Sequence, residues 1–91
     1  MKLKYKIQIN DIGDQSIGVA IGDDARYFSN LLFLNETGKT ILELLQNDTS
    51  RPDITKAILH IFEGDKELIE KEVNLFIDQL IDLNLIDNGV N

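Results

Sequence analysis

The sequence predicts an α+β fold of winged-helix type, in which a three-stranded antiparallel sheet is followed by three helices. Up to about residue 34, apolar residues alternate with polar ones, which is typical of strands that bury one face. From residue 35 onward, apolar residues recur every three or four positions, which is typical of helices that bury one stripe. No repeat, linker or low-complexity segment interrupts the 91 residues, so we expect a single domain over 1–91.

Three strands are predicted, at residues 3–9, 16–21 and 27–34. In the first, Leu3, Tyr5, Ile7 and Ile9 alternate with lysine and glutamine, so one face is expected in the core and the other carries a row of lysines. The segments DIGDQ and GDDAR have the composition of turns. Short turns between the strands indicate a meander, which leaves the third strand at an edge of the sheet.

The first helix is predicted at residues 36–46, directly after the third strand. Asn35 is a suitable N-cap, because its side-chain oxygen can accept a hydrogen bond from a free backbone N–H of the first turn. Gly38 is unfavourable inside a helix, and we attribute it to close packing against the sheet. Strand and helix therefore share a boundary of one capping residue.

Two further helices are predicted at residues 51–63 and 66–83. Ser50 with Asp53 resembles a capping box, Gly64 is expected to end the second helix, and Asp65 to cap the third. Asn84 is expected as a left-handed exit from the third helix. The predicted core stripe of that helix consists of Ile69, Val73, Phe76, Leu80 and Leu83, widened by Ile77 and Ile81.

The net charge of −7 comes wholly from the second half of the chain. A protein that binds nucleic acid needs a basic surface for the phosphates, and one that binds an anionic membrane also needs basic residues. We therefore predict that the protein binds neither nucleic acid nor a membrane. Cysteine is absent, which excludes disulfides and thiolate chemistry. No signal peptide or apolar segment of membrane-spanning length is present, so we expect a soluble, cytoplasmic protein.

Catalytic motifs are not found. The acidic residue nearest to the single histidine, His60, is Glu63, and we do not expect the two to form a catalytic pair; Asp23 and Asp24 lie in a predicted turn. Glu70 and Glu72 project about 200° apart on a helix, so they cannot cooperate. We therefore predict a binding module that is not an enzyme and that uses no cofactor or metal.

The junction Leu34 to Gly38, followed by ILELL, resembles the strand-to-helix junction of the PqqD family, a small domain also called the RiPP recognition element. The run RPDITKAILHIFEGDKELIEKEVNLFIDQLIDLNLI is similar to the second and third helices of that family. The likeness covers residues 27 to 87, while the first two strands match in pattern more than in letters. An aromatic residue that the family often has near Ile41 is missing here.

The resemblance implies a protein that binds the leader segment of a ribosomally made precursor peptide and presents the core segment to a modifying enzyme. In the family the leader adds as an extra strand beside the third strand, in the groove against the third helix. This chain would be a stand-alone form, whose partner is a separate radical SAM or ATP-dependent maturase or a leader peptidase. Neither the pathway nor the precursor follows from the sequence.

The candidate peptide-binding residues come from the predicted edge strand and from one flank of the third helix. An edge strand offers unpaired N–H and C=O groups to an incoming strand. Leu68 and Leu75 lie beyond the core stripe of the third helix, and Ile77 with Ile81 forms the alternative wall. The acidic side chains of the third helix predict a leader with some basic residues. The candidates are Tyr27, Phe28, Ser29, Asn30, Leu31, Leu32, Phe33, Leu68, Glu72, Leu75 and Gln79.

Two other functions remain open at this point. A winged-helix DNA-binding regulator would place the third helix in the major groove, but between Lys66 and Leu83 that helix has two basic and five acidic side chains. A dimerisation or adaptor module would pair the open third strand with a second copy of the chain, giving a homodimer.

Overall fold

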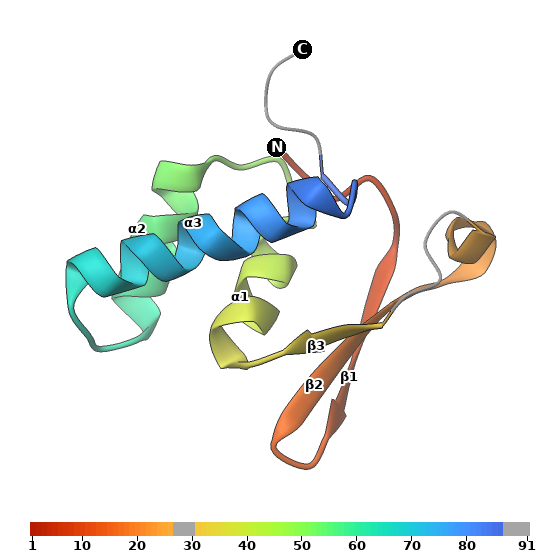
Figure 1. Ribbon diagram of the computed structural model, residues 1–91, viewed down its shortest axis with the longest axis horizontal. Helices are drawn as coiled ribbons and strands as arrows, with labels where there is room; N and C mark the ends of the chain where they lie inside the picture. Colours follow the sequence, from red (N-terminus) through yellow and green to blue (C-terminus); the bar gives the residue numbers. More distant parts are fainter. Residues whose placement is uncertain (27–30, 87–91) are drawn as a thin grey trace.

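The computed structural model of the chain describes residues 1–26 and 31–86. Three strands form one sheet, and three helices follow them and pack together beside it (Figure 1). In chain order the elements are β1 (Ile7–Ile12), β2 (Gln15–Ala20), a short 3-10 helix η1 (Gly22–Arg26), β3 (Leu32–Leu34), α1 (Glu36–Leu44), α2 (Arg51–Ile61) and α3 (Lys66–Asp82).

The sheet has the order β1-β2-β3 with antiparallel pairing throughout. Gly13 has a φ of +61°, a backbone conformation that glycine adopts without a steric cost, and it forms the β1–β2 turn next to the closing pair Ile12 and Gln15. Ile17 stands opposite Phe33, so β3 pairs with the middle of β2. The predicted meander is confirmed.

The first strand begins later than predicted, at Ile7 instead of residue 3. The backbone N–H groups of Leu3 and Lys4 donate to the carbonyls of Leu45 and Leu85, and Leu3 forms an isolated bridge with Ile86. Apolar and polar residues do alternate in this first segment, but its backbone bonds to residues that follow α1 and α3 and not to another strand of the sheet. The N-terminal segment therefore ties the helices together before it enters the sheet.

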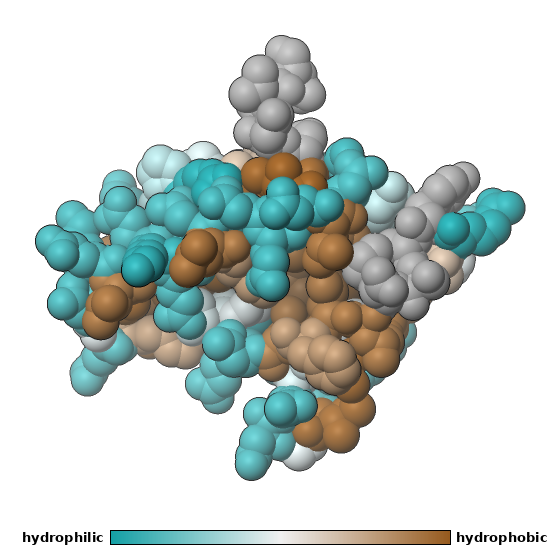
Figure 2. Space-filling view, in the orientation of Figure 1, coloured by the Kyte–Doolittle hydropathy of each residue, from teal (hydrophilic) through white to brown (hydrophobic). Residues whose placement is uncertain are grey.

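Small residues form the core face of β2. Ser16 and Gly18 are buried, and a Cβ on Gly18 would lie 3.2 Å from Ile7 Cγ2. On the other face, Ile17 pairs with Phe33, whose side chain is 71% exposed. Apolar surface gathers over the strands at the lower right of Figure 2, beside the mostly hydrophilic helices. The helices cover only one face of the sheet.

The helix starts are those expected from local capping. Asn35 Oδ1 accepts from the N–H of Gly38 at 2.8 Å, and Ser50 Oγ accepts from the N–H of Asp53 at 3.3 Å. Asp65 caps α3 by accepting from the N–H of Glu67. The N-caps of all three helices agree with the prediction.

Two predictions about glycine are wrong. Gly38 packs against α3 and not against the sheet, since its Cβ would lie 3.1 Å from Phe76 Cε1. Gly64 does not end α2, which stops at Ile61 when Phe62 turns to an extended conformation. Both glycines instead leave room for a side chain of α3, Phe76 in one case and Ile69 in the other.

The core lies between the inner face of the sheet and the three helices. Asn84 leaves α3 with a φ of +61°, as predicted, and Leu85 and Ile86 return to the core. The stripe of α3 is centred one residue away from the prediction: Ile77 is fully buried, Phe76 is half-buried and Leu83 is 39% exposed. The buried apolar residues are Ile7, Leu32, Leu34, Ile41, Leu42, Leu45, Ile54, Ile58, Ile69, Val73, Ile77, Leu80, Leu85 and Ile86.

Within the described ranges, none of the helices combines the length and the apolar character that a membrane crossing requires.

Candidate functional site

The edge of the sheet at β3 is the starting point of the site. β3 pairs with β2 along one side only, and within residues 1–26 and 31–86 no strand pairs with its other side. A sheet edge without a partner strand presents backbone N–H and C=O groups that can bind another strand. Leu32 and Leu34 point into the core, which holds β3 in place, while Phe33 points outward.

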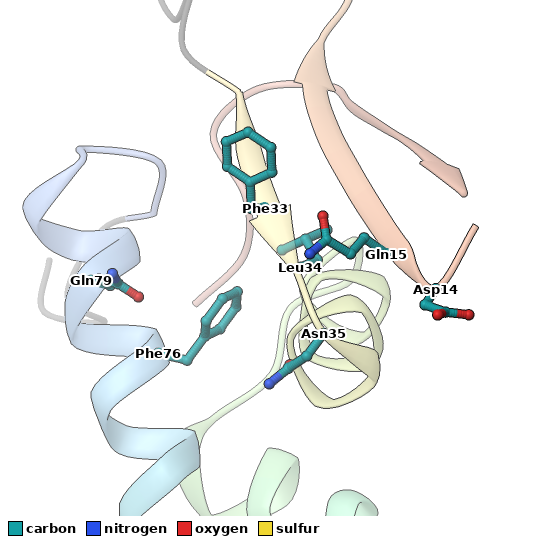
Figure 3. Close-up of a pocket in the computed structure, with 7 residues that line it drawn as sticks. All are labelled: Asp14, Gln15, Phe33, Leu34, Asn35, Phe76 and Gln79. Atoms are coloured by element: carbon teal, nitrogen blue, oxygen red, sulfur yellow. The ribbon is translucent and has the colours of Figure 1, made fainter. Parts of the chain in front are cut away.

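A cavity of about 600 Å³ lies between β3 and α3. Figure 3 shows Phe76 and Gln79 projecting from α3 toward β3, with Phe33 on the strand and Asn35 at its end. Leu34 also contributes to the lining, and Asp14 and Gln15 close the cavity from the β1–β2 hairpin. The two aromatic rings give the cavity an apolar interior, and amide and carboxylate groups surround it.

A second cavity of about 180 Å³ continues the first along α3. The two cavities share Asn35, Phe76 and Gln79. The second is further lined by Thr37, Gly38 and Ile41 of α1 and by Glu72 and Leu75 of α3. We call the two cavities together the β3–α3 groove.

The structure brings four of the predicted site residues together in this groove, namely Phe33, Glu72, Leu75 and Gln79. Leu31 is 52% exposed and precedes β3, and Leu32 belongs to β3 but buries its side chain in the core. Leu68, 66% exposed, lines neither cavity of the groove. Tyr27, Phe28, Ser29 and Asn30 lie outside the described residues.

The alternative wall of Ile77 and Ile81 lines neither cavity of the groove. Ile77 is fully buried, and Ile81 is partly buried and packs against the core. Among the residues that the structure describes, it is the flank of Leu75 that lines the cavities.

Several residues that line the groove were not among the candidates from the sequence, and of these Phe76 and Asn35 line both cavities. Phe76 falls into the apolar stripe of α3 by spacing, so a pattern of period 3.6 assigns it to the core. In the structure the neighbouring Ile77 takes the central position, and Phe76 turns its ring toward Gly38. Gly38 was the available signal, because a glycine in the first turn of a helix marks a close approach of another group.

A polar cluster supports the hairpin end of the groove. Lys39 Nζ of α1 donates to both carboxylate oxygens of Asp11, at 3.0 and 3.1 Å, and the Ser16 hydroxyl donates to Asp11 Oδ1 at 2.5 Å. The hydrogen bond from Ser16, followed by those from Lys39, lowers the pKa of Asp11 below its usual value, and the Asp11 carboxylate raises the pKa of Lys39. The cluster joins the hairpin to the start of α1.

The described residues contain no group of three histidine or acidic side chains that could hold a metal ion. His60 is exposed on α2, and Glu70 and Glu72 face different cavities. The groove offers backbone bonding, aromatic contact and charge, which are the means of binding a peptide.

The fold and the groove together define a small α+β domain that presents an open sheet edge beside its longest helix. The sequence profile of the family described as "Coenzyme PQQ synthesis protein D (PqqD)" matches residues 22–86, and the chain belongs to this family. The family predicted from the sequence is thereby confirmed.

Among solved structures, the chain is similar to one described as "TbiB1 in Complex with the TbiA(beta) Leader Peptide". The two chains superpose with a TM-score of 0.72 at 19% sequence identity, over 100% of both chains. This likeness confirms the predicted α+β order of a three-stranded sheet followed by three helices. The sequence matches none of the curated proteins with which it was compared.

Proposed function

We propose that this protein binds the leader segment of a ribosomally synthesised precursor peptide, which adds as a fourth strand to β3 in the β3–α3 groove. The observation that carries the proposal is the open edge of β3 directly beside a cavity with two aromatic rings, Phe33 and Phe76. Membership of the PqqD family and the likeness to a chain solved with a leader peptide support it.

Strand addition explains why the site combines a sheet edge with a helix. The backbone groups of β3 supply hydrogen bonds that any sequence can make, and pockets for alternate side chains supply the selectivity. Phe76 and Leu75 on α3 offer the apolar contacts, while Gln79 and Asn35 offer amide groups at the rim. A leader held in this way leaves its core segment free for another protein.

In this proposal the chemistry belongs to a separate enzyme, such as a radical SAM or ATP-dependent maturase or a leader peptidase. The family consists of peptide-binding partners of such enzymes, and the groove itself contains no nucleophile paired with a base among its lining residues. The protein then acts as a peptide chaperone, which we place in the cytoplasm.

Leu75→Glu and Leu68→Glu form a matched test of this site. Both leucines are exposed on α3, at 60% and 66%, and one heptad separates them, so both substitutions should leave the fold intact. We expect Leu75→Glu to weaken binding of the leader from the nearest precursor reading frame by about tenfold or more, since a charge replaces an apolar contact. Leu68→Glu should bind as the wild type does, as measured by isothermal titration calorimetry.

Equal affinities of the two variants would place the leader outside the groove. A second measurement distinguishes leader binding from the adaptor function. If the chain pairs its β3 edge with a second copy, its mass will rise with concentration in the absence of peptide. Sedimentation at several concentrations measures this directly.

A further inference from the structure

We infer that the β3–α3 groove selects leaders in which an apolar residue and a lysine or arginine lie two positions apart, with the basic side chain against Glu72. The inference rests on the proposed leader binding and adds a charge requirement to it. It follows from the charges that line the groove and from the spacing of residues along α3.

The charged side chains that line the groove are both acidic. Asp14 lines the first cavity and Glu72 the second, and no lysine or arginine among the described residues lines either one. Within residues 1–26 and 31–86 neither carboxylate takes part in an ion pair. A neighbouring cavity of about 550 Å³ shares Asp14, Gln15 and Asn35 with the groove, and its one cation, Lys39, is bound by Asp11. The groove is therefore anionic, with carboxylates free to bind a cation.

The spacing along α3 matches that of an extended peptide. Glu72 precedes Phe76 by four residues, which corresponds to about 6 Å of rise along a helix. In a strand, side chains at positions i and i+2 share a face and lie about 6.7 Å apart. A leader residue packed on Phe76 thus brings the residue two positions away to Glu72.

The helix pair on the other side of α3 shows the opposite charge. A cavity of about 390 Å³ between α2 and α3 is lined by three basic side chains, Arg51, Lys56 and Lys66, and by one acidic side chain, Glu70. Asp78 binds Arg51 at 2.6 Å, which leaves Lys56 and Lys66 against Glu70. Glu70 and Glu72 thus project to different sides of α3, as their spacing predicted. A basic leader is attracted to one groove and repelled by the other, so charge directs it to the open strand.

A charge exchange tests the inference. The protein is titrated with the synthetic leader from the nearest precursor reading frame, and with the same leader in which the basic residue two positions from its apolar anchor is changed to glutamate. We expect Glu72→Lys to weaken binding of the natural leader by roughly five- to tenfold, the scale of a partly exposed charge pair replaced by repulsion. The altered leader should bind Glu72→Lys better than it binds the wild type.

Glu70→Lys is the control, because it makes the same change of charge at mid-helix on the side of α3 away from the groove. Equal losses for Glu72→Lys and Glu70→Lys, or a groove-bound leader without the apolar–basic pair, would overturn the inference. If the proposed leader site itself is wrong, the Leu75→Glu variant will also bind the leader with normal affinity. A response to Leu75→Glu without any response to the charge exchange removes the charge requirement alone.

Discussion

Asn35 has three roles at once. It is the residue directly after β3, it caps α1 through its bond to the N–H of Gly38, and it lines both cavities of the groove. Its capping role could be predicted from the sequence because an N-cap depends on neighbours within three residues. Its place in the groove could not, because that depends on Phe76 of α3.

Asn35→Ala should lower the free energy of unfolding by about 1 kcal/mol, the usual cost of removing an N-cap side chain. Asn35→Asp should retain most of the stability, since aspartate also caps and its charge suits the positive end of the helix dipole. Urea denaturation followed by circular dichroism measures both. If Asn35→Ala is as stable as the wild type, the hydrogen bond to Gly38 contributes nothing to the fold.

At the scale of elements, the hairpin is held to α1 by the cluster of Asp11, Ser16 and Lys39. The elements themselves followed from the sequence, because period-two and period-3.6 patterns are local. The start of β1 did not, since Leu3 and Lys4 bond to Leu45 and Leu85, which no local pattern shows. The predicted centre of the buried stripe of α3 was also wrong by one residue, because it depends on a contact between distant residues. Phe76 packs against Gly38 of α1, and Ile77 takes the central position.

The cluster predicts a dependence of stability on pH. Because the folded state lowers the pKa of Asp11 below its unfolded value of about 3.9, its contribution is complete above about pH 5 and is lost as the pH falls through the folded value. The raised pKa of Lys39 has the opposite sign, so its contribution is lost as the pH rises through that value. Asp11→Asn should therefore lose less stability than the wild type between pH 5 and about pH 3.

Denaturation midpoints in urea over this pH range test the assignment. Asp14→Asn is the control, because Asp14 lies in the same hairpin and forms no side-chain hydrogen bond or ion pair with the described part of the chain. An acid limb that is identical for Asp11→Asn and the wild type would show that the cluster does not couple to folding.

For the molecule as a whole, the acidic charge of α3 favours a peptide over DNA as the ligand. The structure shows that α3 buries Ile69, Val73, Ile77 and Leu80, and the sequence gives that helix two basic and five acidic residues. A helix of this kind in the major groove would repel the phosphates. This conclusion came from composition, whereas the position of the groove required the tertiary structure.

We expect no saturable binding of duplex DNA at about 0.15 M salt, measured by fluorescence anisotropy of a labelled duplex. The leader peptide, titrated under the same conditions, is the positive control. Binding to DNA that saturates and weakens steeply with added salt would restore the regulator function.

The length of β3 has a consequence for the behaviour of the protein in a crowded cell. An open sheet edge is a template for aggregation, and proteins limit this risk by keeping edge strands very short. With a strand of three residues, Leu32–Leu34, the edge is too short to hold another chain by backbone bonds alone. Lasting attachment at β3 then requires side chains that also fit the helix, so an unrelated extended segment gains little from this edge.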